Sequence, residues 1–349
     1  MITLIRWILW PVSLIYQCVV WVRNLCYDKG IFKSTSFDIP TIVVGNLAVG
    51  GTGKSPMTEY LINLLSPHYR IATLSRGYGR KTKGFHYVQT DSEALQIGDE
   101  PLQFKRKFPH ITVAVSEDRC AGIQRIKNSH DLVLLDDAYQ HRKLKPGFSI
   151  LLLEYRSFYK PVLMLPTGDF RDNFSAIRRA DLIVITKCPD HITTEHKRHI
   201  EQKIKKYNTV PILYTRIAYD TPLDKIGKPI QSDIVGMDIL LFCGIANPKP
   251  LVAYLESKGN KVHPILYRDH HNFTEKDYNH IKRAYETIPS SNKLLLTSEK
   301  DFQRLDIMLF ENYPLGYIPI KTTFLDEGDK SFDSTVRNYV RQQHFVNKP

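Results

Sequence analysis

Residues 41–55 have the sequence TIVVGNLAVGGTGKS, in which a short β-branched run, Thr41 to Val44, leads into glycines and then Lys54 and Ser55. The run predicts a strand, and a helix is expected to begin near Lys54. Glycines let backbone amides curl around phosphate oxygens, a lysine reaches the outer phosphates and a hydroxyl can hold magnesium. The stretch therefore predicts a nucleotide phosphate-binding loop made of Val49, Gly50, Gly51, Thr52, Gly53, Lys54 and Ser55. The strict G-x-x-x-x-G-K-S/T spacing places its first glycine at Ala48, so this is a variant, and the alternative is a glycine-rich turn without function.

Apolar runs like the one at 41–44 recur along the chain, with helical stretches between them. They cover residues 70–74, 111–115, 132–135, 150–153, 182–185, 211–214, 239–242, 263–266 and 293–296. Their continuous β-branched and leucine character suits strands buried on both faces, as in a parallel sheet covered by helices. The predicted fold is α/β, a P-loop NTPase-like, doubly wound and mostly parallel sheet with a second, smaller α/β region.

Three regions are expected. Residues 1–30 form an N-terminal membrane-interface helix, 31–225 a kinase-like core around the phosphate loop, and 226–349 a C-terminal α/β region. The turn-rich, charged stretch 219–232 sets the soft boundary between the last two. The polar tail from Arg341 is expected to fray.

The N-terminal run from Trp7 to Trp21, WILWPVSLIYQCVVW, is apolar and bracketed by Arg6 and Arg23. It is shorter than the roughly 20 apolar residues that cross a bilayer. No small-residue cleavage site follows, as a secretory signal would require. Terminal tryptophans and flanking arginines suit a helix lying in the membrane interface, and a helix simply packed on the domain is the alternative.

Lysine and arginine outnumber the acids 48 to 36, so anionic partners are favoured. Charge alone does not choose among nucleic acid, lipid head groups and phosphorylated substrates, although no nucleic-acid-binding motif is present. The five cysteines show no CxxC pair or histidine-flanked cluster of the kind that structural zinc needs, so reduced thiols are expected.

Acidic residues follow several predicted strands. Asp136-Asp137 ends the run 132–135, where a carboxylate can reach a metal ion or its water shell, although strand-end acids also cap helices. Asp99-Glu100 opens a predicted helix, and Asp269-His270-His271 follows the run 263–266. Phosphoryl transfer also needs cations that stabilise the migrating group. Arg119 and Arg171 are candidates, although the residues alone do not single them out among the many arginines of the chain.

One segment bears on whether the nucleotide carries adenine or guanine. A guanine-reading loop has Asn/Thr-Lys-x-Asp, whereas Thr186-Lys187-Cys188-Pro189-Asp190 places the acid one residue too far along. This spacing favours ATP.

These segments together resemble the tetraacyldisaccharide 4'-kinase family, the lipid A 4'-kinases. The matching segments are 45–56, 75–80, 98–101, 136–141, 242–248, 269–270 and 297–301, in that order. The resemblance implies an ATP- and magnesium-dependent transfer of the γ-phosphate to the 4'-hydroxyl of a tetraacylated glucosamine disaccharide 1-phosphate. The implied location is the cytoplasmic face of the Gram-negative inner membrane, with peripheral or monotopic attachment, a lipid substrate, no nucleic acid and no obligate protein partner.

Roles follow residue by residue from the resemblance. Asp99 is the base toward the sugar hydroxyl, and His270 tunes or orients it. Ser55 and Glu100 serve magnesium, surrounded by a strand-end network of Asp136, Asp137 and Gln140. Phosphoryl charge is stabilised by Lys54, Arg119 and Arg171.

Other interpretations stay open. The basic segment 76–83 is either a lipid-phosphate patch or a solvated loop. The whole chain could instead be a P-loop ATPase or a kinase for another membrane lipid, or a membrane-tethered nucleotide switch. A base in one half and a histidine in the other suggest closure about a hinge.

Overall fold

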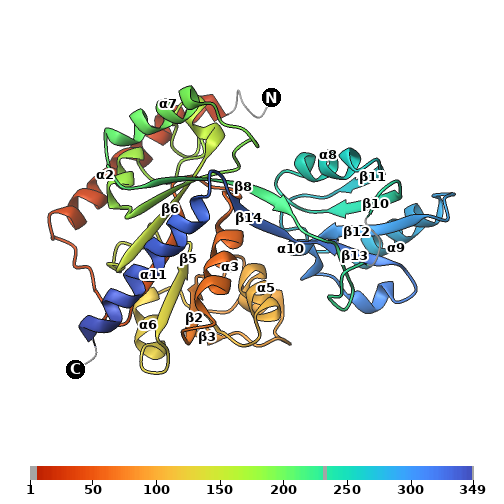
Figure 1. Cartoon of the computed structure of the whole chain (residues 1–349), viewed down its shortest axis with the longest axis horizontal. Helices are drawn as coiled ribbons and strands as arrows, with labels where there is room; N and C mark the ends of the chain where they lie inside the picture. Colours follow the sequence, from red (N-terminus) through yellow and green to blue (C-terminus); the bar gives the residue numbers. More distant parts are fainter. Residues whose placement is uncertain (1–5, 231–233, 348–349) are drawn as a thin grey trace. The chain divides into compact units, whose positions relative to one another are not determined.

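The computed structural model describes residues 6–230 and 234–347, which divide into two compact units. The first comprises residues up to Ile217 together with those from Thr322 onward, and the second comprises Ala218–Lys321. Each unit is built around its own sheet (Figure 1).

The first sheet contains nine strands among the described residues, in the order β14-β8-β7-β6-β1-β5-β2-β4-β3. Parallel pairing runs from β8 through to β4, and β3 is antiparallel to β4. The strands are β1 Thr41–Asn46, β2 Ile71–Ser75, β3 His86–Tyr87, β4 Thr112–Val115, β5 Leu132–Asp136, β6 Phe148–Glu154, β7 Leu182–Thr186, β8 Ile212–Tyr219 and β14 Ile320–Phe324.

Helices cover both faces of this sheet because its strands are apolar on both sides. Alternate residues such as Val43 and Val44 contribute to two different cores. One face is covered by α2 Trp10–Asp28, α6 Arg119–Ile126, η2 Phe174–Arg179 and α7 Thr194–Lys205, and the other by α3 Lys54–Leu65, α5 Asp99–Lys107 and α11 Gly328–Asn347. The short α4 Ala94–Ile97 and η1 Tyr155–Tyr159 complete the unit. This is the doubly wound, mostly parallel arrangement predicted from the sequence.

The second unit is a smaller layered α/β structure. Its sheet has the order β11-β10-β12-β13-β9, parallel except for the pairing of β9 with β13. The strands are β9 Leu223–Asp224, β10 Asp238–Cys243, β11 Lys261–Leu266, β12 Lys293–Ser298 and β13 Leu315–Ile318. The helices are α8 Lys249–Ser257, α9 Glu275–Glu286, α10 Glu299–Phe302 and η3 Ile307–Phe310, with α8 and α9 packed into separate cores on either face.

Every predicted apolar run overlaps a strand, but the division of the chain differs from the sequence-based one. The units separate at residues 217/218, not 225/226, and the segment from Thr322 returns to the first unit. The cause is α11, whose Phe332, Val336 and Val340 are fully buried against the first sheet. The expectation that the chain frays from Arg341 was wrong, because α11 continues to Asn347. Residues 231 and 232 of the expected boundary stretch lie outside the described residues.

The N-terminal helix α2 runs from Trp10 to Asp28, within the predicted region 1–30 and past the end of the apolar run at Trp21. Pro11 lies in its first turn, where the missing N–H costs no hydrogen bond. One face binds the core: Ser13 exchanges hydrogen bonds with Thr167, and Tyr16 donates to the carbonyl oxygen of Arg171 at 3.0 Å. None of the described helices is both long and apolar enough to cross a bilayer.

Candidate active site

The phosphate loop leaves β1 at Asn46 and enters α3 at Lys54, as the sequence predicts. Gly50 and Gly53 have φ values of +105° and +87°, in a region that side chains with a Cβ rarely adopt. Two side chains fix the loop: Nδ2 of Asn46 donates to Oγ1 of Thr52 at 2.6 Å, and Oγ1 of Thr186 donates to the carbonyl oxygen of Thr52 at 2.8 Å. The loop is thus held open at the N-terminus of α3, where free N–H groups favour anions.

Two of the predicted site residues, Lys54 and Ser55, open α3. The Nζ of Lys54 lies 3.9 Å from Oδ1 of Asp137, and the Lys54 side chain is only 13% exposed. The Oγ of Ser55 donates to Oε1 of Glu100 at 2.9 Å. The helix therefore presents a cation and a hydroxyl on the side that carries the predicted acids.

Asp136 and Asp137 lie beside the loop because β5 pairs with β1, which places Asp136 opposite Val44. Asp136 is buried, and Thr58 donates to its Oδ1 at 3.4 Å. Burial, together with the negative charges of Glu100 and Asp137, raises the pKa of Asp136 well above its ordinary value. Asp136 therefore lies among negative charges that the nearby positive charges do not balance.

Asp137 differs from its neighbour in environment. Burial opposes its ionisation, but hydrogen bonds from Arg171 and the charges of Lys54, Arg171 and Arg119 lower its pKa. Arg171 reaches it with both terminal nitrogens, of which Nη1 lies 3.0 Å from Oδ2, and Nη2 also donates to Oδ1 of Asn46. The residue has a positive φ of 51°. It is therefore an ionised carboxylate that gathers the cations of the site.

Arg119 and Gln140 complete this group. Arg119, at the start of α6, is buried, and its Nη2 lies 3.4 Å from the carbonyl oxygen of Asp137. Burial lowers its pKa to about 10, so it stays protonated at neutral pH. The Nε atoms of Arg119 and Arg171 are buried without a hydrogen-bond partner among the described residues. Gln140 donates to the carbonyl oxygen of Asn46 at 2.7 Å.

The turn before Asp99 is fixed by close backbone packing. A Cβ on Gly77 would lie 2.6 Å from the carbonyl oxygen of Ile97, and one on Gly98 would lie 3.0 Å from the carbonyl oxygen of Tyr78. Arg80 is 3% exposed and pairs with Glu117. Part of the basic segment 76–83 thus has a structural task, since it supports the turn that begins α5 with Asp99 and Glu100.

Asp269 and His270 lie in the second unit, beyond the end of β11. His270 has a φ of +58°, and its N–H donates to the carbonyl oxygen of Gly244 at 3.1 Å. The Nζ of Lys300 lies 3.0 Å from Nε2 of His270 and 3.3 Å from Oδ1 of Asp269. Nearby, the buried Asp301 accepts from the N–H of Gly244 at 3.0 Å. Three segments distant in sequence, 242–248, 269–270 and 297–301, therefore form one cluster.

Sequence reasoning assigned no role to Asn46, Thr58, Thr186 or Lys300, which tie these groups together. Asn46 had a recognisable signal, since it is a polar residue at the end of a buried strand beside the loop. Lys300 had none, because its partners are thirty residues away and are set by the pairing of β12 and β11 with β10.

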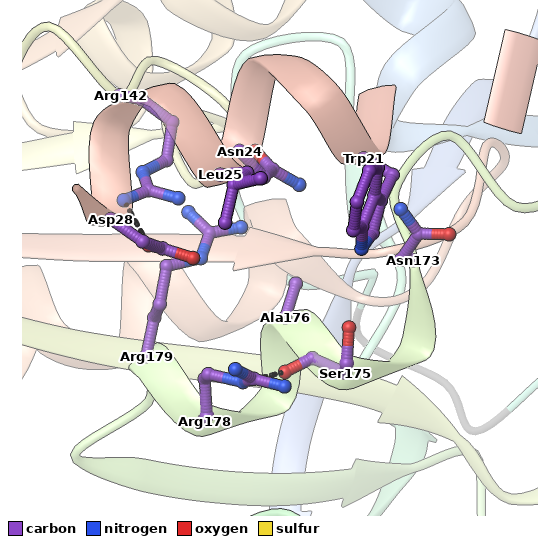
Figure 2. A pocket seen from close by; sticks show the side chains of 10 residues that line it. All are labelled: Trp21, Asn24, Leu25, Asp28, Arg142, Asn173, Ser175, Ala176, Arg178 and Arg179. Carbon is purple, nitrogen blue, oxygen red and sulfur yellow. Dashed lines mark hydrogen bonds and ion pairs between the residues drawn. The ribbon is translucent and has the colours of Figure 1, made fainter. Parts of the chain in front are cut away.

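A pocket lies between α2 and η2 (Figure 2). It has a volume of about 100 Å³ and contains none of the predicted site residues. Arg142, Arg178 and Arg179 line it together with Trp21 and Leu25 of α2. Arg142 pairs with Asp28 at 2.8 Å, and Nε of Arg178 donates to the carbonyl oxygen of Ser175 at 3.1 Å.

The parallel sheet and the loop between β1 and α3 define a P-loop NTPase-like α/β protein. Residues 5–341 match the family described as Tetraacyldisaccharide-1-P 4'-kinase. The chain belongs to this family, as its sequence motifs predict.

Curated relatives and one solved structure agree with this membership. The tetraacyldisaccharide 4'-kinase of Flavobacterium johnsoniae is 42% identical over 97% of this chain and 98% of the relative. That of Phocaeicola vulgatus is 40% identical over 97% of this chain and 95% of the relative. A crystal structure of LpxK from Aquifex aeolicus in complex with ATP is 27% identical, has a TM-score of 0.75, and covers 96% of this chain and 99% of that one.

Proposed function

We propose that the chain is an ATP-dependent kinase that transfers the γ-phosphate to the 4'-hydroxyl of a tetraacylated glucosamine disaccharide 1-phosphate, a step of lipid A biosynthesis. The observation that carries this proposal is family membership over nearly the whole chain, joined to a phosphate loop beside a lysine, a hydroxyl, carboxylates and two arginines. Kinases need these groups for phosphoryl transfer.

The loop from Val49 to Ser55 binds the triphosphate of ATP. Its amides and the first turn of α3 favour phosphate oxygens, and Lys54 adds charge beside the outer phosphates. Asp137 brings Lys54 and Arg171 together. The Nζ of Lys54 lies 3.9 Å from Oδ1 of Asp137, and Arg171 forms an ion pair with the same carboxylate. The free Nε donors of Arg119 and Arg171 provide hydrogen bonds that phosphate oxygens can accept.

Magnesium fits the oxygen-rich side of this site. Ser55, Glu100 and Asp136 offer hydroxyl and carboxylate oxygens, which this ion prefers, and Gln140 belongs to the network around them. The raised pKa of Asp136 marks a place where a cation would relieve carboxylate repulsion. When bound, magnesium neutralises charge on the phosphates.

The acceptor hydroxyl is activated by Asp99. This residue begins α5 and is followed in sequence by Glu100, which contacts Ser55. The proposed base is thus the sequence neighbour of a proposed magnesium ligand. His270 orients Asp99 in the working enzyme. Lys300 donates to Nε2 of His270, so the other ring nitrogen carries the proton that can be donated to a carboxylate.

The acceptor is a lipid, so the enzyme works at a membrane surface, which we place at the cytoplasmic face of the bacterial inner membrane. α2 supports peripheral attachment: Val12, Ile15, Val19 and Val22 form an outward row at helical spacing, each about half exposed or more. The C-terminal half of α2 also lines the pocket of Figure 2, where Arg142 and Arg179 are paired with Asp28 and Asp172.

One assay tests the function. Purified protein is incubated with γ-labelled ATP, magnesium and the tetraacyl disaccharide 1-phosphate in detergent micelles, and label in the lipid is measured. Asp99→Ala should abolish transfer and leave ATP binding intact. Absence of label with wild-type protein, or label only in inorganic phosphate, would refute the kinase, and near-normal transfer by Asp99→Ala would remove Asp99 from its role.

A further inference from the structure

A group of possible metal ligands lies outside the site described above. Ligand atoms of Asp118, Cys120 and His141 all lie within 4.8 Å of one another. The cysteine is buried, and its Sγ lies 3.6 Å from the carbonyl oxygen of Lys143. The sequence hides this grouping because twenty residues, including β5, lie between the cysteine and the histidine, which meet only through the fold.

His141 supplies the second observation. Its Nε2 is buried and, within residues 6–230 and 234–347, makes no hydrogen bond. Burying a polar atom without a partner carries a free-energy cost, so such an atom calls for an explanation. A metal ion bound by the lone pair of this imidazole nitrogen would remove that cost.

We propose that Asp118, Cys120 and His141 bind a zinc-type divalent cation, and that the bound ion restrains Arg119. Thiolate and imidazole select zinc-like ions over magnesium, which prefers oxygen ligands. Three protein ligands leave one of four tetrahedral positions to water.

Asp118 can serve the ion without abandoning its structural task. Its Oδ1 caps α6 by accepting from the N–H groups of Cys120 and Ala121, at 3.0 and 3.2 Å. Its Oδ2 accepts from the Nζ of Lys143, whose side chain is 54% exposed. Such exposed ion pairs contribute little to stability, so Lys143 can leave when a cation arrives.

The link to catalysis runs through Arg119, which stands between two of the ligands in sequence. Its Nη1 donates to the carbonyl oxygen of Glu117 at 3.0 Å, and Nη2 lies near that of Asp137. Drawing the ligands together to metal-bonding distance moves the first turn of α6 toward the loop that holds Asp137 and His141. A displacement of about 1 Å at a positioning group can lower turnover roughly a hundredfold. The ion should therefore inhibit the kinase.

The binding test uses cobalt as a spectroscopic substitute for zinc, with full-length, metal-free protein in micelles. One equivalent of Co²⁺ should produce a thiolate charge-transfer band and the visible bands of tetrahedral cobalt, and Zn²⁺ should abolish them. Cys188→Ser, which alters another buried cysteine of the same unit, should keep the band. Cys120→Ser and His141→Asn should each weaken binding at least tenfold. No band in the wild type, or an unchanged band in Cys120→Ser, overturns the site.

The activity test rests on the proposed function and is read separately. At saturating magnesium and ATP, one equivalent of Zn²⁺ should slow lipid phosphorylation at least tenfold in the wild type and less than twofold in Cys120→Ser. Equal inhibition of both proteins would overturn the link to Arg119. A protein without kinase activity would refute the proposed function and leave the cobalt result standing. Thermal melting of metal-free Cys120→Ser checks that the variant folds.

Discussion

Asp137 shows how one residue organises a site. It accepts from Arg171, lies within 3.9 Å of Lys54, and offers its carbonyl oxygen to Arg119. Its neighbour Asp136 has the opposite electrostatic situation, buried with no cation in contact among the described residues. Adjacent carboxylates thus have pKa values shifted in opposite directions, which is a pattern of functional sites.

Lys54 is the first residue to test. Lys54→Met should lower kinase turnover about 10²–10³-fold, because a charge positioned on the phosphates is lost. The same substitution at Lys160, which is exposed, is the control and should leave turnover unchanged. Lipid phosphorylation under saturating ATP measures both, and equal rates for Lys54→Met and wild type would contradict the assignment.

Asp136→Asn should stabilise the metal-free protein while abolishing turnover. Because the folded-state pKa is raised, the folded state holds a proton that the unfolded state has released, so stability falls as pH rises from about 4 toward that raised value. The substitution removes this pH dependence and should raise the free energy of unfolding at neutral pH by on the order of 1 kcal/mol or more. Urea unfolding at several pH values measures it.

Asp137→Asn is the matched control with the opposite sign. The depressed pKa of Asp137 means that its charge stabilises the fold above the unfolded-state pKa and that this contribution is lost as pH falls. The variant should therefore be less stable than wild type at neutral pH. If both substitutions shift stability in the same direction, the electrostatic account of this pair is wrong.

At the scale of elements, α2 links the protein surface to the phosphate loop. Tyr16 donates to the carbonyl oxygen of Arg171, and the N–H of Arg171 donates to that of Leu47 at 2.8 Å. Arg23 donates to the carbonyl oxygen of Gln140 at 2.8 Å. The helix that we assign to the membrane surface therefore contacts the segments that carry Arg171 and Gln140.

The double variant Ile15→Ser/Val19→Ser should weaken binding to vesicles of phosphatidylethanolamine and phosphatidylglycerol roughly tenfold or more. These side chains are 66% and 59% exposed and would bury apolar surface in the interface. Ile226→Ser/Met308→Ser, at positions 74% and 75% exposed in the second unit, is the control and should bind normally. Vesicle flotation distinguishes the two variants. Equal binding of both would show that a surface other than α2 binds the membrane.

At the scale of the whole molecule, the chain passes between the units twice, within β8 and within β14. The residues that we propose bind ATP and magnesium lie in the first unit. His270 and Lys300 lie in the second unit. We propose that Asp99 of the first unit and His270 of the second act in the same reaction.

A double-mutant cycle tests this proposal. If Asp99 and His270 act together, Asp99→Asn/His270→Ala should lose little more turnover than the more damaging single variant, because the partner's contribution has already gone. His263→Ala, in the same unit and bound to Asp238, serves as the comparison and should combine additively with Asp99→Asn. Additive losses of turnover for Asp99 and His270 would show that the two residues do not act together.

The sequence by itself determined the phosphate loop, the strands of the parallel sheets and the family. These are properties of contiguous residues: Val43 and Val44 lie on a buried strand, and glycines at 50 and 53 permit positive φ. The unpredicted strands are short or at edges, such as β3 and β9, where few residues carry the pattern.

The tertiary structure alone decided which distant residues meet. Asn46 contacts Arg171 because β1 lies between β5 and β6, and residues from 322 onward rejoin the first unit because α11 buries its apolar face there. Cys120 meets His141 for the same kind of reason. Local chemistry is written in adjacent residues, whereas strand order and helix packing result from the free energy of burying the whole chain, which no short segment contains.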